Sequence, residues 1–502
     1  MKARLLYIIG VSMIGMSAMA QDAYDAANFS QSDLNGTARY VAMGGALGAL
    51  GGDISTMGSN PAGIGLFRRS EATLSLSAIT TDEKGQLGHD ATRGSLDQAG
   101  MVFVMDQGNR SSKGLQYVNF GVNYAKRRNH LGNASLDVQN LNGIFSQTYQ
   151  LADLCKMAID NDYFGGMAVD MSTPYYDEHG NIIKDGIVVD IYDNDGNLDH
   201  YDGCGAQSAL YKRATYGSTS QVDFNLSFNV SDKFFWGVSV GVYDINYHRE
   251  SFYYELGTDG NDYNFSNYYD TKGDGFDVKL GAIIRPIDNS PLRFGFSIHT
   301  PTWYMMEDVN GASLFYKGNL IDRKGTDPYE YSFRTPWKFG VSMGHTIGRN
   351  VAFGAEYEFS DPSSAKYDSR DWDNDAYFVA INTITKETLK PQHTFKVGLE
   401  LKPADNFAIR AGYNYVSSPF KDDAFRTILY DGPFTETDYT NWGAINRYTL
   451  GVGFRFQGGF FDLAYQFQNQ KGDFYAFDDQ DLKPTEIKNN RSQILATLGF
   501  KF

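Results

Sequence analysis

The chain ends with Ser492-Gln-Ile-Leu-Ala-Thr-Leu-Gly-Phe-Lys-Phe502, a stretch in which apolar residues occupy every second position. Side chains of a β-strand point alternately to its two faces, so this stretch has two different faces. One face carries Ile494, Ala496, Leu498, Phe500 and Phe502, and the other carries Thr497, Gly499 and Lys501. This pattern is typical of a transmembrane β-barrel strand, with an apolar face toward lipid and a polar face toward the lumen.

The same alternation recurs along the chain, for example at 448–456 and 395–401. Counting such segments predicts about fourteen strands, an even number as single-chain bacterial barrels require. The predicted strands are 71–80, 98–106, 114–126, 220–230, 234–248, 274–285, 292–305, 330–347, 350–360, 392–402, 406–416, 446–456, 459–470 and 491–502. We therefore predict an all-β fold, a transmembrane antiparallel β-barrel over residues 71–502.

The connections between these strands alternate in length. Tight connections carry turn residues, as at Ser231-Asp232-Lys233, Gly348-Arg349, Pro403-Ala404-Asp405 and Gln457-Gly458. The long polar connections are 81–97, 127–219, 249–273, 306–329, 361–391, 417–445 and 471–490. Short periplasmic turns and longer extracellular loops produce this alternation in barrels, whereas a soluble sandwich does not.

The longest connection, 127–219, is predicted to be a large extracellular loop insertion. Spacing of apolar residues over 144–160 predicts a helix, and 181–199 resembles a hairpin. The two cysteines of the chain, Cys155 and Cys204, both lie in this loop. In an exported chain they predict an intraloop disulfide, because a metal pair would need further ligands clustered nearby.

One acidic stretch in the same loop, Asp193 to Asp199, resembles a fragment of a calcium-binding loop. Ile191 occupies the first ligand position and Asp202 stands where a closing Glu is needed, so a solvated hairpin turn is favoured. The sequence leaves calcium binding there open.

The N-terminus predicts export. Residues 1–20 contain a basic start, an apolar stretch from Leu5 to Met16 and the small-x-small sequence Ala18-Met19-Ala20. These are the parts of a signal peptide cleaved before Gln21. Together with the terminal aromatic Phe502, which resembles the C-terminal signal of bacterial outer-membrane barrels, they predict a multi-pass protein of a Gram-negative cell outer membrane.

Composition and motifs exclude several functions. A net charge of -16 leaves no basic stripe for nucleic acid. The eight histidines are scattered without a pair at ligand spacing, and no nucleophile elbow, metalloprotease helix or phosphate-binding loop is present. We therefore predict no catalysis, no cofactor and no metal.

The segment between the signal peptide and the first strand, 21–70, is rich in small and apolar residues. Its glycines permit tight bends inside a confined lumen, so it is predicted to be a plug, or hatch. It contains Gly36-Thr-Ala-Arg39, Met43-Gly-Gly-Ala46, Gly52-Asp53 and Asn60-Pro61-Ala62-Gly63-Ile64-Gly65. These motifs resemble the FadL/TodX-type outer-membrane transporter family, specifically its Bacteroidetes branch, in which Asn-Pro-Ala belongs to the hatch.

The resemblance implies passive uptake of hydrophobic molecules such as long-chain fatty acids. A ligand would be captured outside, bind in the lumen and leave sideways through the wall near the hatch residues Asn60, Pro61, Ala62 and Gly63. Gly121 is the candidate wall opening, since a glycine in a strand permits a bulge. The candidates for outer capture are Phe252, Tyr253, Tyr254, Trp303, Tyr304, Met305 and Met306. For Trp303 and Tyr304 a place in the aromatic girdle at the membrane surface is favoured.

Two other functions remain open on the sequence alone. A water-filled porin for polar solutes should have a charged constriction and an open lumen without a plug. The Gly- and Ala-rich residues 37–52, which predict a plug, therefore argue against a porin. A structural or adhesive surface barrel would place its function in loop 127–219. The expected partners are a hydrophobic small molecule, outer-membrane lipids and lipopolysaccharide, and the barrel-assembly machinery, with the protein acting as a monomer.

Overall fold

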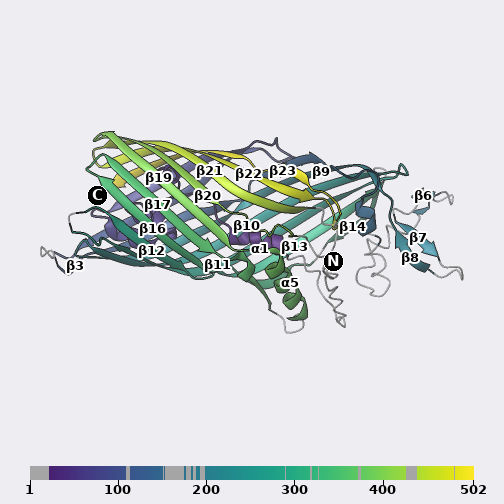
Figure 1. Ribbon diagram of the computed structural model, residues 1–502, viewed down its shortest axis with the longest axis horizontal. Coiled ribbons are helices and arrows are strands. Elements are labelled where there is room, and N and C mark those ends of the chain that lie inside the picture. Colours follow the sequence, from purple (N-terminus) through teal and green to yellow (C-terminus); the bar gives the residue numbers. More distant parts are fainter. Residues whose placement is uncertain are drawn as a thin grey trace.

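A computed structural model describes residues 22–502 apart from 109–112, 151, 153–174, 177–181, 185–187, 193–197, 289, 317–318, 326, 371–374, 425–437 and 480. Its strands form one antiparallel sheet that closes on itself, since β24 pairs with β1 from Arg491↔Thr81 to Lys501↔Glu71. The wall of the resulting barrel has fourteen positions, here called staves, and each is filled by one strand or by two strands end to end. This confirms the predicted fold class. The staves run obliquely along the long axis of the molecule (Figure 1). Within the described residues, no helix has the length and apolarity needed to cross a bilayer.

Eleven staves are single strands. They are β1 (Glu71–Thr81), β2 (Thr92–Asp106), β3 (Leu115–Asn129), β9 (Ala206–Val230), β10 (Phe234–Gly257), β11 (Asp262–Ile284), β19 (Gln392–Ala404), β20 (Phe407–Val416), β21 (Tyr439–Phe456), β22 (Gly459–Tyr475) and β24 (Arg491–Lys501).

Three staves are broken in two. They are β12 (Arg293–His299) with β13 (Trp303–Tyr316), β15 (Tyr329–Arg334) with β16 (Lys338–Ile347), and β17 (Val351–Ser360) with β18 (Lys366–Ser369). Pro301, Pro336 and Pro362 lie in the three breaks. Proline has no backbone N–H to donate to a ladder, so each interrupts its strand. The sequence analysis predicted 292–305 and 330–347 as continuous strands, which is wrong at Pro301 and Pro336.

Outside the membrane the barrel is taller than predicted. Residues 249–273, predicted as a loop, belong mostly to β10 and β11, which pair from Phe234↔Ile284 to Leu256↔Asp262. The outer parts are widened by β4 (Gly132–Asp137), β14 (Asn319–Gly325) and β23 (Thr485–Lys488), and capped by the pairs β5 (Tyr175–Tyr176) with β6 (Ile182–Lys184) and β7 (Val189–Tyr192) with β8 (Leu198–Asp202). The hairpin predicted at 181–199 is confirmed in its second part, where β7 pairs with β8, but its first part, β6, pairs with β5 instead.

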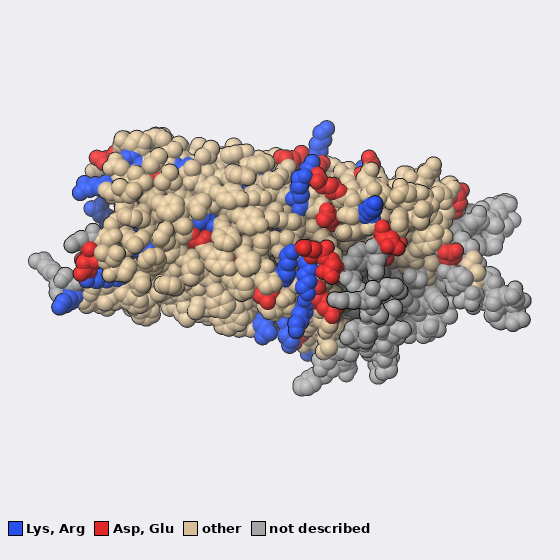
Figure 2. Space-filling model, viewed as in Figure 1, with Lys and Arg blue, Asp and Glu red and all other residues tan. Residues whose placement is uncertain are grey.

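The outer surface divides into two zones. Between the short turns and the middle of the barrel it is largely free of charged side chains, and a band of Lys, Arg, Asp and Glu then crosses it (Figure 2). Exposed apolar side chains such as Leu450, Phe454 and Phe461 occupy the uncharged zone. This zone is the surface expected to contact lipid.

Residues 22–70 lie inside the barrel as the plug. It contains α1 (Ala23–Ser30), α2 (Ala38–Ala42) and the 3-10 helices η1 (Ile54–Gly58) and η2 (Pro61–Leu66). The amide of Ala38 donates to Thr497 Oγ1 at 2.7 Å, and the Arg39 guanidinium pairs with Glu400 at 3.1 Å. The plug is thus bonded to inward-facing polar side chains on distant staves.

One further helix, α5 (Asp375–Thr388), lies beside the outer part of the wall (Figure 1). It follows β18 and η3 (Pro362–Ser364), in a region predicted from the sequence as a loop. The Asn382 side chain accepts a hydrogen bond from the Tyr367 amide and donates one to the Tyr367 carbonyl, each at 2.8 Å. One amide side chain thereby satisfies the backbone of β18 on the edge opposite β15, where an exposed strand edge would otherwise remain.

Candidate binding site and plug

The corner Asn60-Pro61-Ala62-Gly63 is buried between the plug and the wall. The Asn60 side chain accepts a hydrogen bond from the Ala62 amide at 3.2 Å and donates one to the Gly48 carbonyl at 2.9 Å. Pro61 opens η2, a position that needs no backbone N–H. The Pro61 carbonyl accepts a hydrogen bond from Ser227 of β9 at 2.8 Å. The corner therefore links the plug to itself and to the wall.

The wall makes room for the plug with a row of glycines, the glycine belt. Its members lie directly opposite one another on β16, β17, β19 and β20 and are Gly344, Gly354, Gly398 and Gly412. A Cβ added at Gly354 would lie 2.0 Å from the Ala46 carbonyl oxygen, and one at Gly398 would lie 2.3 Å from the Met43 carbonyl oxygen. The plug backbone occupies the space that any larger side chain would need.

On the side of the plug away from the short turns, aromatic side chains fill the lumen. Phe29 of α1 packs edge-on against Tyr247 and Phe333, with ring centroids 5.7 and 6.4 Å apart. This aromatic cluster consists of Ala26, Ala27, Phe29, Tyr243, Ile245, Tyr247, Tyr269, Tyr304, Met306, Tyr329, Tyr331, Phe333, Ala365, Tyr367, Tyr377, Phe378, Ile381, Leu389, Phe420 and Ala424. The α1 helix supplies its centre, and the inner face of α5 covers its side.

A cavity of about 120 Å³, the outer cavity, adjoins α1 and the aromatic cluster. Its apolar lining includes Tyr24, Tyr247, Phe420 and Trp442. Its charged lining consists of the cations Arg128, Arg213, Arg249, Lys488 and Arg491 and the acids Asp25 and Asp438. Five cations facing two carboxylates give this cavity a positive potential, in a chain whose net charge is -16.

Within the outer cavity, Arg213 of β9 forms an ion pair with Asp438, which also accepts a hydrogen bond from the Tyr211 hydroxyl at 2.9 Å. Burial raises the pKa of Asp438, but the charges of Arg213 and Arg249 outweigh burial and hold it below the ordinary value. Asp438 is therefore ionised, and it neutralises only part of the cationic lining.

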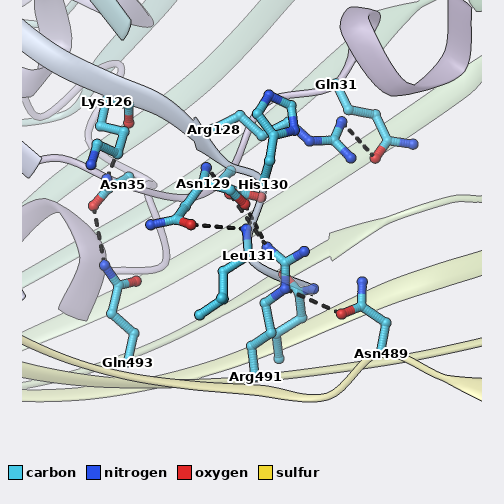
Figure 3. Close-up of polar contacts among 12 residues, drawn as sticks. Gln31, Asn35, Lys126, Arg128, Asn129, His130, Leu131, Asn489, Arg491 and Gln493 are labelled. Atoms are coloured by element: carbon cyan, nitrogen blue, oxygen red, sulfur yellow. Dashed lines mark hydrogen bonds and ion pairs between the residues drawn. The ribbon is translucent and has the colours of Figure 1, made fainter. Parts of the chain in front are cut away.

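A second cavity of about 60 Å³, the inner cavity, is lined by plug residues 30–35. Its charged lining consists of Asp33, Arg127, Lys338, Glu358, Lys396 and Arg447. Gln31 lines both cavities. Figure 3 shows Gln31 of the plug facing Arg128 of β3, and Asn35 of the plug facing Lys126 of β3 and Gln493 of β24. A short plug segment thus separates two cavities that both have cationic linings.

The predicted outer-capture residues divide between the two sides of the wall. Tyr304 and Met306 face inward and belong to the aromatic cluster, so the girdle position predicted for Tyr304 is wrong. Trp303 and Met305 face outward with 38% and 59% of their surface exposed. The stacking of Trp303 on Phe276, with centroids 5.2 Å apart, fits a girdle position.

The other capture candidates lie farther out on β10. Tyr253 is buried in a separate cluster with Tyr211 and Phe474. Its neighbours Phe252 and Tyr254 point to the opposite face of the strand and are partly buried. The structure therefore does not bring these three residues to the outer cavity.

Gly121 of β3 lies where the plug touches the wall. It pairs with Val102 of β2 and Asn225 of β9 in ladders without a register shift at that point. A Cβ there would lie 2.0 Å from Met57 Cε. The wall is closed at Gly121 in this structure, and Met57 occupies the space that the absent side chain leaves.

The loop predictions fall partly outside the described residues. Cys155 and residues 193–197 of the calcium-like stretch lie outside the described residues. Within the described part of the chain, Cys204 forms no disulfide, and its thiol lies 3.2 Å from Thr258 Oγ1. Among the described residues, no group of three or more His, Cys, Asp and Glu side chains is placed to hold a metal ion.

The candidate site residues that the sequence analysis missed face inward. Arg213 and Arg249 lie in segments predicted as loops, and Arg128 lies just beyond a predicted strand end. A signal was present in tyrosines that are separated by even numbers of residues and therefore share one face of a strand. They are Tyr243, Tyr247 and Tyr253 on one strand, and Tyr329 and Tyr331 on another.

Comparison with known proteins identifies the fold. The toluene transporter TodX of P. putida matches over 94% of this chain and 99% of its own, with a TM-score of 0.51 and 13% sequence identity. A FadL homologue of Pseudomonas aeruginosa covers 94% of this chain and 98% of its own at TM-score 0.48 and 14% identity. The toluene transporter TbuX of Ralstonia pickettii covers 93% and 99% at TM-score 0.47 and 13% identity. No protein-family model and no curated protein matches the sequence.

Its closed wall and internal plug place this protein in the class of plugged fourteen-stranded β-barrels. Within that class it has the FadL/TodX-type fold, as the motifs of residues 36–65 predicted. At 13% identity, this similarity concerns the fold alone.

Proposed function

We propose that this protein is an outer-membrane channel for passive uptake of hydrophobic molecules, with long-chain fatty acids as the preferred class. The observation that carries the proposal is the contact between the aromatic cluster and the cationic outer cavity, through Tyr247 and Phe420, which belong to both. The fold shared with hydrophobic-compound transporters supports the general class.

The chemistry of the lumen favours an amphiphile with one anionic end. Guanidinium groups bind carboxylates through paired, charge-assisted hydrogen bonds. An apolar chain gains about 0.8 kcal/mol for each methylene group that it buries, and the aromatic cluster offers such an environment. A cavity of about 120 Å³ holds a head group but not a long chain, so the chain must displace part of α1 or repack the cluster around Phe29.

Lateral exit beside the hatch belongs to the same proposal. A molecule in the lumen reaches the wall near Gly121 only after Met57 moves, because Met57 lies over that glycine. The ladders of β3 with β2 and β9 must also separate locally. Exit at this position therefore requires movement of the plug, and release into the bilayer spares an apolar ligand the aqueous periplasm.

Uptake into liposomes tests this function. Purified protein is reconstituted, and influx of radiolabelled laurate, toluene and a small sugar is measured against protein-free vesicles. The proposal expects protein-dependent laurate influx with little sugar influx. Influx of the sugar alone would support a water-filled porin, and influx of none of them would support a structural or adhesive barrel. Toluene influx without laurate influx would retain the channel but reject the fatty-acid preference.

A further inference from the structure

The plug segment 30–35 is the partition between the outer and inner cavities. Gln31 contributes to both linings, while Asp33, Leu34 and Asn35 line the inner cavity. Any solute passing from one cavity to the other on this path must move these residues. The contacts that hold the segment in place therefore control the passage.

Asp33 is the charged contact of this partition. Its carboxylate lies 3.5 Å from Arg447 Nη2 and 3.8 Å from Arg491 Nη1, and it accepts a hydrogen bond from the Asn129 amide at 3.0 Å. The Asp33 amide donates to the Arg127 carbonyl at 2.7 Å. Burial raises the pKa of Asp33, but the charges of Arg491, Arg447 and Arg128 outweigh it and hold the pKa below its ordinary value. The segment is thus tied to the wall by an ionised group.

The two arginines that pair with Asp33, Arg447 and Arg491, are also held by neutral groups, independently of Asp33. Arg447 donates to Gln468 at 2.9 Å and to Asn414 at 3.0 Å, and Arg491 donates to the Asn129 carbonyl at 3.0 Å. The cluster therefore keeps its shape if the Asp33 carboxylate leaves, and it remains a site for an anion.

Two features make the Asp33 contact exchangeable. Its ion pairs of 3.5 and 3.8 Å are longer than the 2.7–2.9 Å of a direct charge-assisted hydrogen bond. Arg491 and Arg128 also line the outer cavity, where an incoming anion arrives. One group of arginines is thus reachable from outside and engaged by the plug from inside.

We propose that Asp33 is a built-in competitor of the ligand's anionic group. An amphiphilic carboxylate that enters the outer cavity beside Arg128 takes Arg491 from Asp33 and so releases segment 30–35. The inference rests on the proposed uptake function and adds its gating residue. A ligand shifts such an equilibrium only by its difference in affinity for the two states. An anion binds the arginines more tightly when Asp33 has left them, so its affinity differs between the two states. A neutral molecule of the same shape binds both states equally and does not shift the equilibrium.

The first test measures the partition without any ligand. Asp33→Asn keeps the size of the side chain but removes its charge, and sugar leak through reconstituted protein is expected to rise by roughly tenfold, which corresponds to about 1.4 kcal/mol. Asp33→Glu retains the carboxylate and should leak no more than threefold above wild type, on the order of 0.65 kcal/mol. Asp288→Asn is the matched control, because it removes one exposed carboxylate, paired with Lys233, that lines neither cavity. Heat-modifiable migration on gels confirms that each variant is folded.

The second test measures the competition. Laurate and dodecanol have the same chain length and differ in the charge of the head group. Wild-type protein should leak more sugar with laurate than with dodecanol, after subtraction of protein-free vesicles, and Asp33→Asn should lose this difference. Equal effects of laurate and dodecanol on the wild type would overturn the inference, as would an Asp33→Asn variant that stays sealed. If the wild type transports no hydrophobic molecule while Asp33→Asn still leaks, the proposed function fails, but the role of Asp33 in holding segment 30–35 in place stands.

Discussion

Gly354 of β17 lies directly opposite Gly398 of β19, and carbonyl oxygens of the plug occupy the place of both missing side chains. The plug is therefore seated by backbone contacts that only glycine permits. Such contacts fix the position of the plug without covalent bonds, and they make the seal sensitive to one methyl group.

Gly354→Ala tests the glycine belt. The added Cβ would lie 2.0 Å from the Ala46 carbonyl oxygen, so the plug must shift away from β17. Overpacking of this kind costs roughly 1–3 kcal/mol. We expect an increased sugar leak with unchanged heat-modifiable migration. Gly94→Ala on β2, where the added atom meets open space, is the control. A sealed Gly354→Ala protein would show that the seal tolerates displacement there.

The double substitution Asn60→Ala with Pro61→Ala tests the plug corner. It removes the cap of the Ala62 amide and the bond to the Gly48 carbonyl, with an expected loss of about 1 kcal/mol for the cap. The barrel strands do not depend on these bonds. We expect loss of regulated fatty-acid uptake together with a sugar leak, measured in the same vesicles. A folded double variant that transports fatty acid at the wild-type rate and excludes sugar would contradict a hatch function for this corner.

Arg249→Gln tests the cationic lining of the outer cavity, because Arg249 lies outside the Asp33 cluster. Loss of one charged partner typically costs about 1.5–3 kcal/mol, so the half-saturating laurate concentration should rise by roughly tenfold or more. Half-saturation by dodecanol should stay as in the wild type. Arg334→Gln, an exposed position on β15, is the control. Equal losses for both ligands would indicate a packing role for Arg249.

Phe502→Ser tests assembly. The Phe502 amide donates to the Ser70 carbonyl at 3.0 Å, and its exposed ring lies near Phe103. Removing the terminal aromatic leaves the closing ladder of β24 with β1 intact but takes away the end of the predicted recognition signal. We expect a lower yield of inserted barrel in cells, scored by heat-modifiable migration. An unchanged yield would argue that this signal resides elsewhere.

The Cys155–Cys204 pairing remains a prediction for the exported protein. A disulfide across a loop of this length would contribute about 4 kcal/mol by the chain-entropy relation. Alkylation without reductant, followed by mass measurement, distinguishes a bridge from thiols. Addition of two alkyl groups would refute the pairing.

The sequence by itself determined the barrel and the presence of a plug. In the strands 448–456 and 492–502, the lipid-facing positions are mostly apolar and the lumen-facing positions are mostly polar or small. This alternation has a period of two because neighbouring side chains of an extended chain point to opposite faces, so it can be read from a short segment alone. The motifs of residues 36–65 likewise lie within one short segment and are readable without a structure.

The outer barrel and the site were decided by tertiary structure. Away from the apolar outer zone, the outward face of β10 and β11 is no longer uniformly apolar, while inward residues such as Tyr253 and Tyr269 are buried in clusters. The sequence alternation therefore fades, and 249–273 reads as a loop although most of it pairs between β10 and β11. The cavities combine Asp33, Arg128, Arg447 and Arg491 from four distant segments. Inward polar residues look alike along the chain, and only closure of the barrel around the plug decides which arginines meet Asp33.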